Sequence, residues 1–398
     1  MTPDLPGSTE SLRRQNTARV LLSLRQSGPA KRAQLAKRTG LAKATVGVIV
    51  ADLEASGAVD EDESRPGGRG RPGRPISLRE RTFLGLGLEL NVDYVSAVVL
   101  DLAGRVQLSE TLPVPAGTPL EGHPVFDLAR RIERLFPAGA HRLLGATVAV
   151  PGLVREDNRS MAWAPNLGIE GSALAVELEA ALGQRCAVQV DNDANCAALA
   201  EAHHGAATDV AHALYLTGTV GIGAGIINDG RLVRGAAGFA GEVGHLPIGE
   251  PTARCGCGRL GCWEASIGLH AMLADTGMPE LETPVRSAEN VAASAEHDTR
   301  VAAALERLGL RVGLGLATLA NVLDPAVIVL GGYFVPLGER VLAPARTVLE
   351  DRVVSAAQHR PELRLSTLGI QAAATGAAEQ SLHGVFAGDV GLTADPPR

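Results

Sequence analysis

The sequence is most informative at Gly241-Glu242-Val243-Gly244-His245, which is followed by Cys255-Gly256-Cys257-Gly258 and then by Gly261-Cys262-Trp263-Glu264. One imidazole and three thiols form the donor set of a closed tetrahedral zinc site, and the glycines between them allow a short chain to wrap around one ion. Four protein ligands leave no open position for water or substrate, so we expect the zinc ion to be structural and not catalytic. The predicted ligands are His245, Cys255, Cys257 and Cys262.

The overall composition is typical of a folded protein with two or three domains. The chain has 398 residues, of which 45% are hydrophobic and 20% charged, enough to bury substantial cores. Its apolar stretches are too short for a membrane-spanning helix, and residues 1–10 lack the pattern of a secretion signal. Three of the five cysteines are clustered, which favours metal binding over a disulfide framework. We therefore expect a cytoplasmic protein.

The charges are distributed unevenly along the chain. Residues 1–81 contain 15 Lys and Arg against 9 Asp and Glu, whereas the remainder contains 22 against 35. All three lysines, Lys31, Lys37 and Lys43, lie in this first part. A basic head on an acidic body indicates that the head binds a polyanion, although a solvated basic face is the simpler alternative.

The spacing of apolar residues predicts three helices in the head, over residues 16–25, 31–39 and 42–56. Ala36, Gly40 and Val46 occupy the positions where a helix-turn-helix needs a small residue, a turn residue and a core residue. The third helix of such a motif lies in the major groove, and the start of the second lies near phosphates. The predicted DNA contacts here are Lys31, Arg32, Lys43, Ala44, Thr45 and Gly47.

A segment rich in Gly, Pro and Arg follows at residues 64–75. Such a composition is compatible with a flexible linker. Its four arginines also suit the basic wing of a winged helix, in which an Arg-Gly-Arg-Pro stretch enters an A·T-rich minor groove. On this second interpretation, the segment contacts DNA through Arg69, Arg71 and Arg74.

From residue 82 onward, short apolar runs alternate with helical patterns. The predicted strands are 83–88, 95–100, 105–108, 144–150, 187–190, 213–216 and 327–330, and the clearest helices are 124–136, 195–204 and 301–323. This alternation predicts an α/β architecture with helices flanking the sheets. The length of the body favours two lobes with a cleft between them.

Two further stretches lie directly after predicted strands. Residues 217–225 and Gly331-Gly332 are glycine-rich, and glycines there would let the backbone approach a phosphate or sugar oxygen. Asp191-Asn192-Asp193-Ala194-Asn195 follows another strand and opens a helix. Its carboxylates suit a hydrogen bond to a sugar hydroxyl or general base catalysis, while Asp and Asn are equally common as helix N-caps.

These motifs together resemble the ROK family of repressors, open reading frames and sugar kinases, in its long form with a winged helix. The resemblance rests on Glu242-x-Gly-His245, on residues 255–264, on Asn192-Asp193-Ala-Asn195 and on residues 217–225. It implies an α/β chain with a winged helix-turn-helix domain at residues 1–80 and a two-lobed, actin-like (ASKHA, ribonuclease H-like) domain at 81–398. Lobe 1 would comprise about 81–191 plus the C-terminal helix, and lobe 2 about 192–375.

The resemblance also implies a sugar site in the cleft. Asp193 stands where the family's kinases hold their catalytic base, and His245 would contact the sugar as well as the zinc ion, which would link the metal to the ligand. The sugar-binding residues implied by the family are Gly152, Asn166, Asn192, Asp193, Glu242, His245 and Glu264.

One departure from the kinase pattern concerns the first phosphate loop. The family's kinases have Asp-x-Gly-x-Thr there, whereas this chain has Glu89-Leu90-Asn91-Val92-Asp93. Asn91 replaces the glycine that allows close approach of a phosphate, and Asp93 would repel it, so we expect no catalytic activity. The sequence thus predicts a sugar-responsive transcription regulator, most simply a repressor, that binds a pseudo-palindromic operator as a homodimer or tetramer and is released by a sugar. The alternative is an ATP-dependent hexose or N-acetylhexosamine kinase that carries a DNA-binding head.

Overall fold

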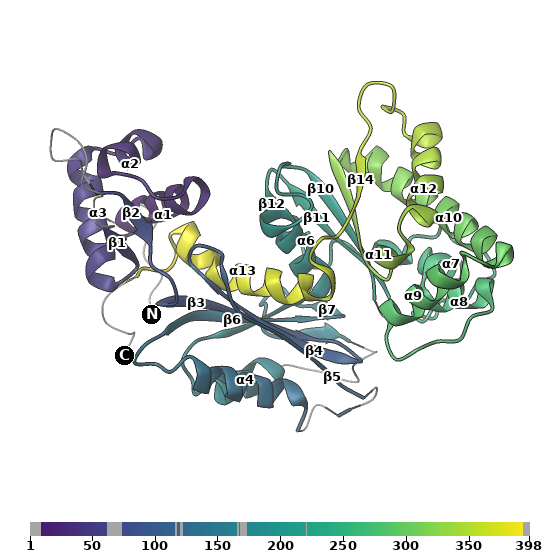
Figure 1. The fold of residues 1–398 in the computed structure, drawn as a ribbon, viewed down its shortest axis with the longest axis horizontal. Coiled ribbons are helices and arrows are strands. Elements are labelled where there is room, and N and C mark those ends of the chain that lie inside the picture. Colours follow the sequence, from purple (N-terminus) through teal and green to yellow (C-terminus); the bar gives the residue numbers. More distant parts are fainter. Residues whose placement is uncertain are drawn as a thin grey trace.

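The computed structural model describes residues 9–61, 74–115, 118–119, 122–164, 167, 173–219 and 221–392. The N-terminal head contains α1 (Thr9–Ser27), α2 (Arg32–Thr39) and α3 (Lys43–Ser56), followed by an antiparallel pair of strands, β1 (Val59–Glu61) and β2 (Ile76–Leu78). Figure 1 shows the head at one end of the molecule, beside the C-terminal helix. The three predicted helices are therefore present, and the predicted wing lies between β1 and β2, mostly outside the described residues.

The head forms because its helices share one apolar core. Val20, Leu35, Val46 and Val50 are among its fully buried residues, at the spacing that the sequence predicts. α2 and α3 both end at glycines with left-handed backbones, Gly40 and Gly57, which close the helices. α1 begins earlier than predicted, at Thr9 and not near residue 16, because its first turns are polar and exposed and lack the apolar periodicity used for prediction.

A first five-stranded sheet follows the head. Its strand order is β5-β4-β3-β6-β9, with β3 paired parallel to β6 and β6 parallel to β9. The strands are β3 (Phe83–Leu90), β4 (Tyr94–Asp101), β5 (Val106–Pro113), β6 (Arg142–Val150) and β9 (Val188–Asn192). One face packs against α4 (Pro124–Leu135) and α5 (Ala173–Ala181), and the other against α13 (Ala372–Ala387) (Figure 1). The short strands β7 (Leu153–Val154) and β8 (Met161–Trp163) pair beside it.

A second five-stranded sheet has the order β12-β11-β10-β13-β14. Its strands are β10 (Ala213–Gly218), β11 (Ile222–Asn228), β12 (Arg231–Leu232), β13 (Val327–Gly332) and β14 (Glu362–Leu365). α6 (Asp193–His204) packs on one face, and a helical layer covers the other. This layer contains α7 (Glu264–Ile267), α8 (Leu269–Thr276), α9 (Pro284–Ser294), α10 (Thr299–Leu323), α11 (Phe334–Leu337) and α12 (Glu339–Arg352). None of the helices within the described ranges is both long enough and apolar enough to cross a membrane.

The two sheets repeat one topology. In each, three consecutive antiparallel strands are followed by two strands that join parallel on the other side of the first strand. Two equivalent α/β lobes, with α6 and α13 packed against each other between them, give the duplicated arrangement of an actin-like fold (Figure 1). The predicted α/β, two-lobed architecture is confirmed.

Most of the glycine-rich stretch at 217–225 belongs to the strands β10 and β11, which pair antiparallel. A Cβ atom on Gly225 would lie 2.4 Å from the Cβ of Ala198 and 2.6 Å from the Ala194 carbonyl oxygen, both on α6. These glycines therefore allow the sheet to pack closely on a helix. Gly331 has a comparable role, since a Cβ there would overlap the Tyr215 side chain.

The contact between α6 and α13 gives a test of this packing. A Cβ atom on Gly376 of α13 would lie 1.7 Å from the Cys196 carbonyl oxygen of α6, so Gly376→Ala must push the two helices apart. We expect a loss of about 1–3 kcal/mol in the free energy of unfolding, measured by urea denaturation, although alanine favours helix formation. Gly139→Ala is the control, because its Cβ would meet nothing within 4 Å. Equal stability of the two variants would contradict the close packing.

The head is joined to the body by a continuous apolar cluster. Leu21 and Leu24 of α1 belong to the same cluster as Ala378 and Leu382 of α13. The guanidinium of Arg25 on α1 donates to Glu379 Oε2 of α13 at 2.5 Å, and the same oxygen lies 3.0 Å from His204 Nε2 of α6. The head is therefore anchored to α13 at a point that also contacts α6.

Candidate functional site

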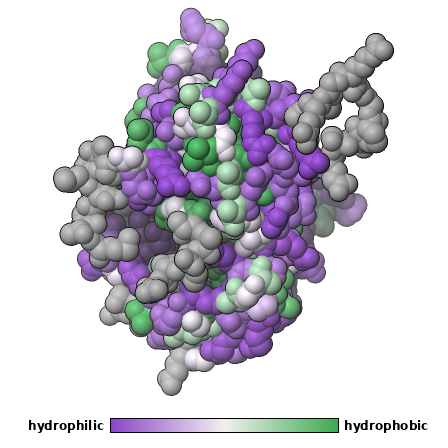
Figure 2. All heavy atoms as spheres, turned by 90° about the vertical axis from the view of Figure 1, so that its left-hand side faces the viewer, coloured by the Kyte–Doolittle hydropathy of each residue, from purple (hydrophilic) through white to green (hydrophobic). Residues whose placement is uncertain are grey.

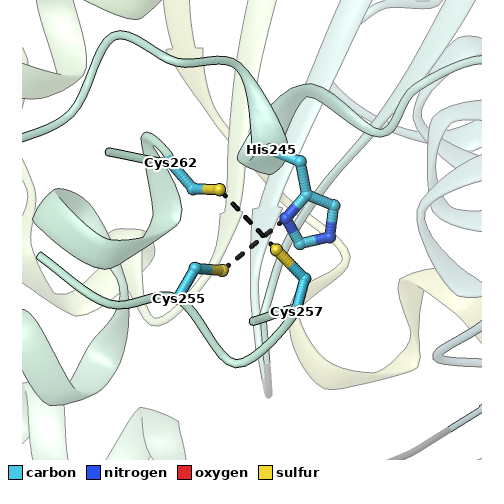
Figure 3. A group of neighbouring side chains, drawn as sticks. All are labelled: His245, Cys255, Cys257 and Cys262. Atoms are coloured by element: carbon cyan, nitrogen blue, oxygen red, sulfur yellow. Dashed lines mark hydrogen bonds between the residues drawn. The ribbon is translucent and has the colours of Figure 1, made fainter. Parts of the chain in front are cut away.

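The four predicted zinc ligands come together in the structure. Figure 3 shows the side chains of His245, Cys255, Cys257 and Cys262 pointing toward one point. His245 ends the short helical turn η1 (Val243–His245), and the three cysteines lie in the segment between η1 and α7. Their ligand atoms all lie within 4.8 Å of one another. His245 Nδ1 is 3.7 Å from Cys255 Sγ, and the sulfur atoms of Cys257 and Cys262 are also 3.7 Å apart.

These distances fit a tetrahedral zinc ion. Zn–S bonds of about 2.3 Å and Zn–N bonds of about 2.0 Å separate neighbouring ligand atoms by about 3.5–3.8 Å. The donor set, three thiols and one imidazole, is also that of structural zinc sites. His245, Cys255, Cys257 and Cys262 would hold the ion, and its chemistry would be structural, since all four positions are filled by the protein.

Glycines position the segment that carries Glu242 and His245. Gly241 has φ +105°, and a Cβ atom there would lie 2.0 Å from the Ala224 carbonyl oxygen of β11. A Cβ on Gly244 would lie 2.4 Å from the Ile222 carbonyl oxygen of the same strand. Only glycine allows both close approaches, so the spacing of the two glycines fixes the 241–245 segment on the edge of the second sheet.

The other end of the cluster is anchored by Trp263, which is 1% exposed. Its indole N–H donates to the Arg311 carbonyl oxygen at 3.0 Å, and its backbone N–H donates to the Leu246 carbonyl oxygen at 2.8 Å. A Cβ on Gly315 of α10 would collide with the indole ring. The zinc-ligand loop is thus attached to the core of the second lobe.

The predicted sugar residues of the first lobe lie at the junction of β9 and α6. Asn192 caps α6 by accepting the Asn195 backbone N–H at 3.1 Å, and its amide donates to the Gly152 carbonyl oxygen at 3.2 Å. Asp193 begins α6 and is 8% exposed. Asn192 is therefore a cap, as one of the two sequence interpretations proposed, and it also ties Gly152 to the site. Asn166 lies outside the described residues.

The second lobe contributes Glu242 and Glu264. Glu242 Oε2 lies 3.9 Å from His245 Nε2, the ring nitrogen that faces away from the cysteines. Glu264 accepts the Ile222 backbone N–H at 2.9 Å and lies 3.3 Å from Cys255 Sγ. Both carboxylates therefore adjoin the cysteine–histidine cluster, from opposite sides of His245 and Cys255.

Electrostatics connects the two lobes at this site. Burial raises the pKa of Asp193 to about 7, and the negative charge of Glu242 contributes to the increase. Asp193 at the start of α6 therefore lies close enough to Glu242 for their charges to interact, and Glu242 and Glu264 both adjoin the cluster that contains His245. The carboxylate and amide oxygens of these residues are acceptors, which suit the hydroxyl groups of a sugar.

The turn after β3, where the family's kinases bind phosphate, is filled by its own side chains. The Asn91 amide donates to Glu89 Oε1 at 3.2 Å and to the Tyr94 hydroxyl at 3.1 Å. The Tyr94 hydroxyl donates to Glu89 Oε1 at 2.5 Å. Both carboxylate oxygens of Asp93 are buried without a hydrogen-bond partner. The turn therefore contains two carboxyl groups and no open glycine backbone.

Glu89 is the buried group that sequence reasoning did not single out as part of the site. It is 2% exposed, and burial raises its pKa to about 8, with a smaller contribution from the charge of Asp193. A charged residue at the end of a continuously apolar strand was the available signal. The sequence analysis also assigned no role to Val48 of α3. Its side chain is 60% exposed, whereas Val46, Ile49 and Val50 are buried.

The raised pKa of Glu89 predicts how stability changes with pH. A carboxyl whose pKa is higher in the folded state stabilises fully below its unfolded value and loses that contribution as pH rises toward about 8. We expect the free energy of unfolding to fall between pH 5 and pH 9. Glu89→Gln keeps an acceptor for Asn91 and Tyr94 and should remove roughly 3–5 kcal/mol of this fall. Chemical denaturation at both pH values measures it.

A matched control for that experiment is Glu156→Gln, which alters an exposed glutamate. Its pH dependence should equal that of the unmodified protein. If Glu89→Gln shows the same pH dependence as Glu156→Gln, then Glu89 is not the group that titrates.

The structure also locates most residues predicted to contact DNA. Lys43 and Ala44 are exposed at the start of α3, while Thr45 and Gly47 are half-buried. Lys31 is exposed at the start of α2, and Arg74 is exposed before β2. Arg32 forms ion pairs with Glu54 at 3.2 Å and with Glu61, and its predicted contact with DNA stays a prediction. Arg69 and Arg71 lie outside the described residues.

The described surface at the head's end of the molecule is mostly hydrophilic, as expected for a surface that binds a polar partner (Figure 2). Figure 2 shows the face at the head's end of the molecule, where hydrophilic residues cover most of the described surface and hydrophobic ones form small patches. Leu12 and Val48 are its exposed large hydrophobic residues among those described in the head.

Comparison with known proteins finds similarity both to transcriptional regulators and to a sugar kinase. The xylose repressor of Bacillus subtilis (strain 168) is 28% identical over 370 residues, which cover 92% of this chain and 94% of that protein. The crystal structure of a ROK family transcriptional regulator, a homolog of the E. coli MLC protein, has a TM-score of 0.79 at 26% identity, covering 95% of this chain and 98% of that one. A ROK family glucokinase from Streptomyces griseus, solved with glucose and AMPPNP, has a TM-score of 0.64 at 25% identity and covers 76% of this chain and 100% of its own.

The family itself is shown by a direct match. Residues 85–382 match the ROK family, a span that includes both sheets, both central helices and the cysteine–histidine cluster. Because this match covers well over half of the sequence, the chain belongs to the ROK family.

Proposed function

We propose that this protein is a sugar-responsive DNA-binding repressor, in which a sugar bound between the lobes releases an operator from the head. The observation that carries the proposal is the apolar cluster that joins the three-helix head and its β1–β2 pair to α13 of a body that belongs to the ROK family. The similarity to a ROK transcriptional regulator extends over 95% of the chain, head included, whereas the similarity to the glucokinase extends over 76%.

Sugar binding would use acceptors from both lobes. Asp193 and Asn192 would contribute from the junction of β9 and α6, and Glu242 and Glu264 from the second lobe. Gly152 and Asn166 are the further sugar contacts that the family resemblance implies. A sugar that donates hydroxyl hydrogens to both sets is held better when the lobes close, so it favours the closed state by its differential affinity. His245 would contact the sugar through the ring nitrogen that faces Glu242, while zinc holds the other nitrogen.

The path from the sugar to the head would run along α6. This helix begins at Asp193 and ends near His204, whose ring meets Glu379 of α13. Glu379 also pairs with Arg25 of α1. A movement of α6 against α13 on lobe closure would therefore change the anchor of the head. The winged head would present α3 to the major groove, with Lys43, Ala44, Thr45 and Gly47 at base edges and Lys31 near phosphates.

Two copies of the head would read a pseudo-palindromic operator, so the active form would be a homodimer or a pair of dimers. Arginines at 69, 71 and 74 would enter the minor groove beside each half-site. Because lysines and arginines displace counterions from DNA, operator affinity should fall steeply with salt concentration.

The absence of kinase activity is part of the proposal, and the Glu89–Tyr94 turn supports it. A kinase must bind phosphates and neutralise their charge, and this turn presents Glu89 and Asp93 instead. A kinase with a DNA-binding head is the second candidate, since buried Asp193 has a pKa of about 7, which suits a general base.

A thermal-shift screen separates the two candidates. The full-length protein is heated with a panel of pentoses, hexoses and N-acetylhexosamines, each with and without ATP and Mg²⁺, and ADP release is measured in parallel. A repressor should be stabilised by one class of sugar to the same extent with or without ATP, and should release no ADP. Sugar-dependent ADP release that disappears in Asp193→Ala would establish the kinase instead.

A further inference from the structure

A cavity lies between the head and the two lobes, away from the predicted sugar residues. It has a volume of about 1250 Å³ and is bounded by α1, by α6, by α13 and by the β11–β12 hairpin. None of Gly152, Asn192, Asp193, Glu242 and Glu264 lines it.

The cavity wall is rich in cationic and imidazole groups. Six such side chains line it, namely Arg25, Arg231, Arg234, His203, His204 and His383, against two carboxylates, Asp229 and Glu379. Glu379 already accepts from Arg25 and lies within hydrogen-bond distance of His204. The Asp229 side chain is 79% exposed and lies 3.5 Å from His212, so it belongs to the rim. The carboxylates are therefore neutralised or solvated.

Several donors in the wall have no carboxylate partner. Arg234 is occupied by a bidentate pair with Asp191, at 2.9 and 2.6 Å. Among the described residues, however, Arg231 and His383 have no ion-pair partner. His203 uses Nδ1 against the Leu199 carbonyl oxygen at 3.0 Å, which leaves its other ring nitrogen for a ligand. Gln26, Thr208 and Gln380 add neutral donors to the same wall.

We propose that this cavity is a binding site for a small phosphorylated metabolite. Exposed Arg231, His203 and His383 are the side chains of its wall that are available to a phosphate group. A guanidinium forks around two phosphate oxygens, and imidazoles add further charge-assisted hydrogen bonds. The volume of about 1250 Å³ exceeds the roughly 300–1,000 Å³ of most small-molecule sites, so the cavity has room for a sugar phosphate or a similar ester together with water. A ligand there would contact the head and both lobes at once.

Direct binding to the full-length protein, without DNA, tests the site. Inorganic phosphate and glucose 6-phosphate are titrated by isothermal calorimetry in a phosphate-free buffer, with glucose as the uncharged comparison. Both phosphate compounds should bind, and Arg231→Gln should weaken both by about tenfold or more. Arg134→Gln, which removes an exposed arginine on α4, is the matched control and should change neither affinity. Thermal denaturation checks that both variants are folded.

Three results would overturn the proposal: no binding of inorganic phosphate at millimolar concentration, equal weakening by Arg231→Gln and Arg134→Gln, or binding of glucose 6-phosphate that Arg231→Gln leaves unchanged. The last result would place the ester in the sugar cleft. Since neither an operator nor release by a neutral sugar enters the measurement, its failure is distinct from a failure of the proposed repressor function.

Discussion

His245→Ala is expected to abolish zinc binding and, with it, the release of operator by sugar. The variant removes the one nitrogen ligand, and three thiolates without it hold the ion far less tightly. It also frees the 241–245 segment that carries Glu242, because the zinc ion would fix that segment from one side and β11 from the other. Zinc content should fall from about one ion per chain to near zero by elemental analysis. Operator affinity without sugar should be retained, because none of the four predicted zinc ligands belongs to the apolar cluster that joins the head to α13.

The matched control is His270→Ala, which removes an exposed histidine of α8 outside the cluster. It should keep both the zinc ion and the response to sugar. A zinc-free His245→Ala protein that still releases operator normally on adding sugar would show that the zinc site and the sugar sensor are independent, against this account.

Asp193→Asn is expected to weaken sugar binding by about 100-fold, equivalent to roughly 3 kcal/mol for a lost hydrogen bond to a charged acceptor. Burial raises the pKa of Asp193 to about 7, so the carboxylate is the major form at pH 8, where calorimetric titration should be made. Sugar at the concentration that releases the unmodified protein should then leave the variant on its operator. The amide keeps the shape of the side chain and removes a buried charge, so loss of response would not arise from unfolding.

Asp127→Asn provides the comparison, since Asp127 is an exposed residue of α4 that pairs with Arg130. It should bind sugar as the unmodified protein does. If Asp193→Asn binds sugar as tightly as Asp127→Asn, the sugar does not contact Asp193, and the pocket assigned by family resemblance is misplaced.

The zinc ligands could be predicted from the sequence because they are nearly local. Three of the four lie within residues 255–262. Gly258 and Gly261 among them have positive φ angles, a backbone conformation that favours glycine. The three helices of the head could be predicted for the same reason, since each has its own apolar spacing and glycine stop. The residues of the sugar site came from a family resemblance, and the structure brings the described ones together across two lobes.

The glycine-rich stretch shows where local reasoning fails. A glycine allows the backbone to approach either a ligand or a neighbouring helix closely, and the sequence does not distinguish the two. The fold shows that Gly225 lies against Ala194 and Ala198 of α6. The strand β11 was hidden by these glycines, because they interrupt its apolar alternation.

Long-range ion pairs could not be predicted at all. Arg32 was assigned to phosphate from its place at the start of α2, whereas Glu54 and Glu61 lie close enough to pair with it. The Arg25–Glu379 pair joins residues from opposite ends of the chain and sets how the head meets the body. Such contacts depend on tertiary packing, which no sequence spacing encodes.

The most direct test of the central claim is operator affinity with and without sugar, measured on the full-length protein in the absence of nucleotide. The operator is first selected from random duplex DNA, and binding is then followed by fluorescence anisotropy at fixed salt concentration. The account predicts a pseudo-palindromic site and a loss of affinity of at least about tenfold on adding one class of sugar. Affinity unchanged by every sugar in a broad panel, or release only when ATP is present, would contradict it.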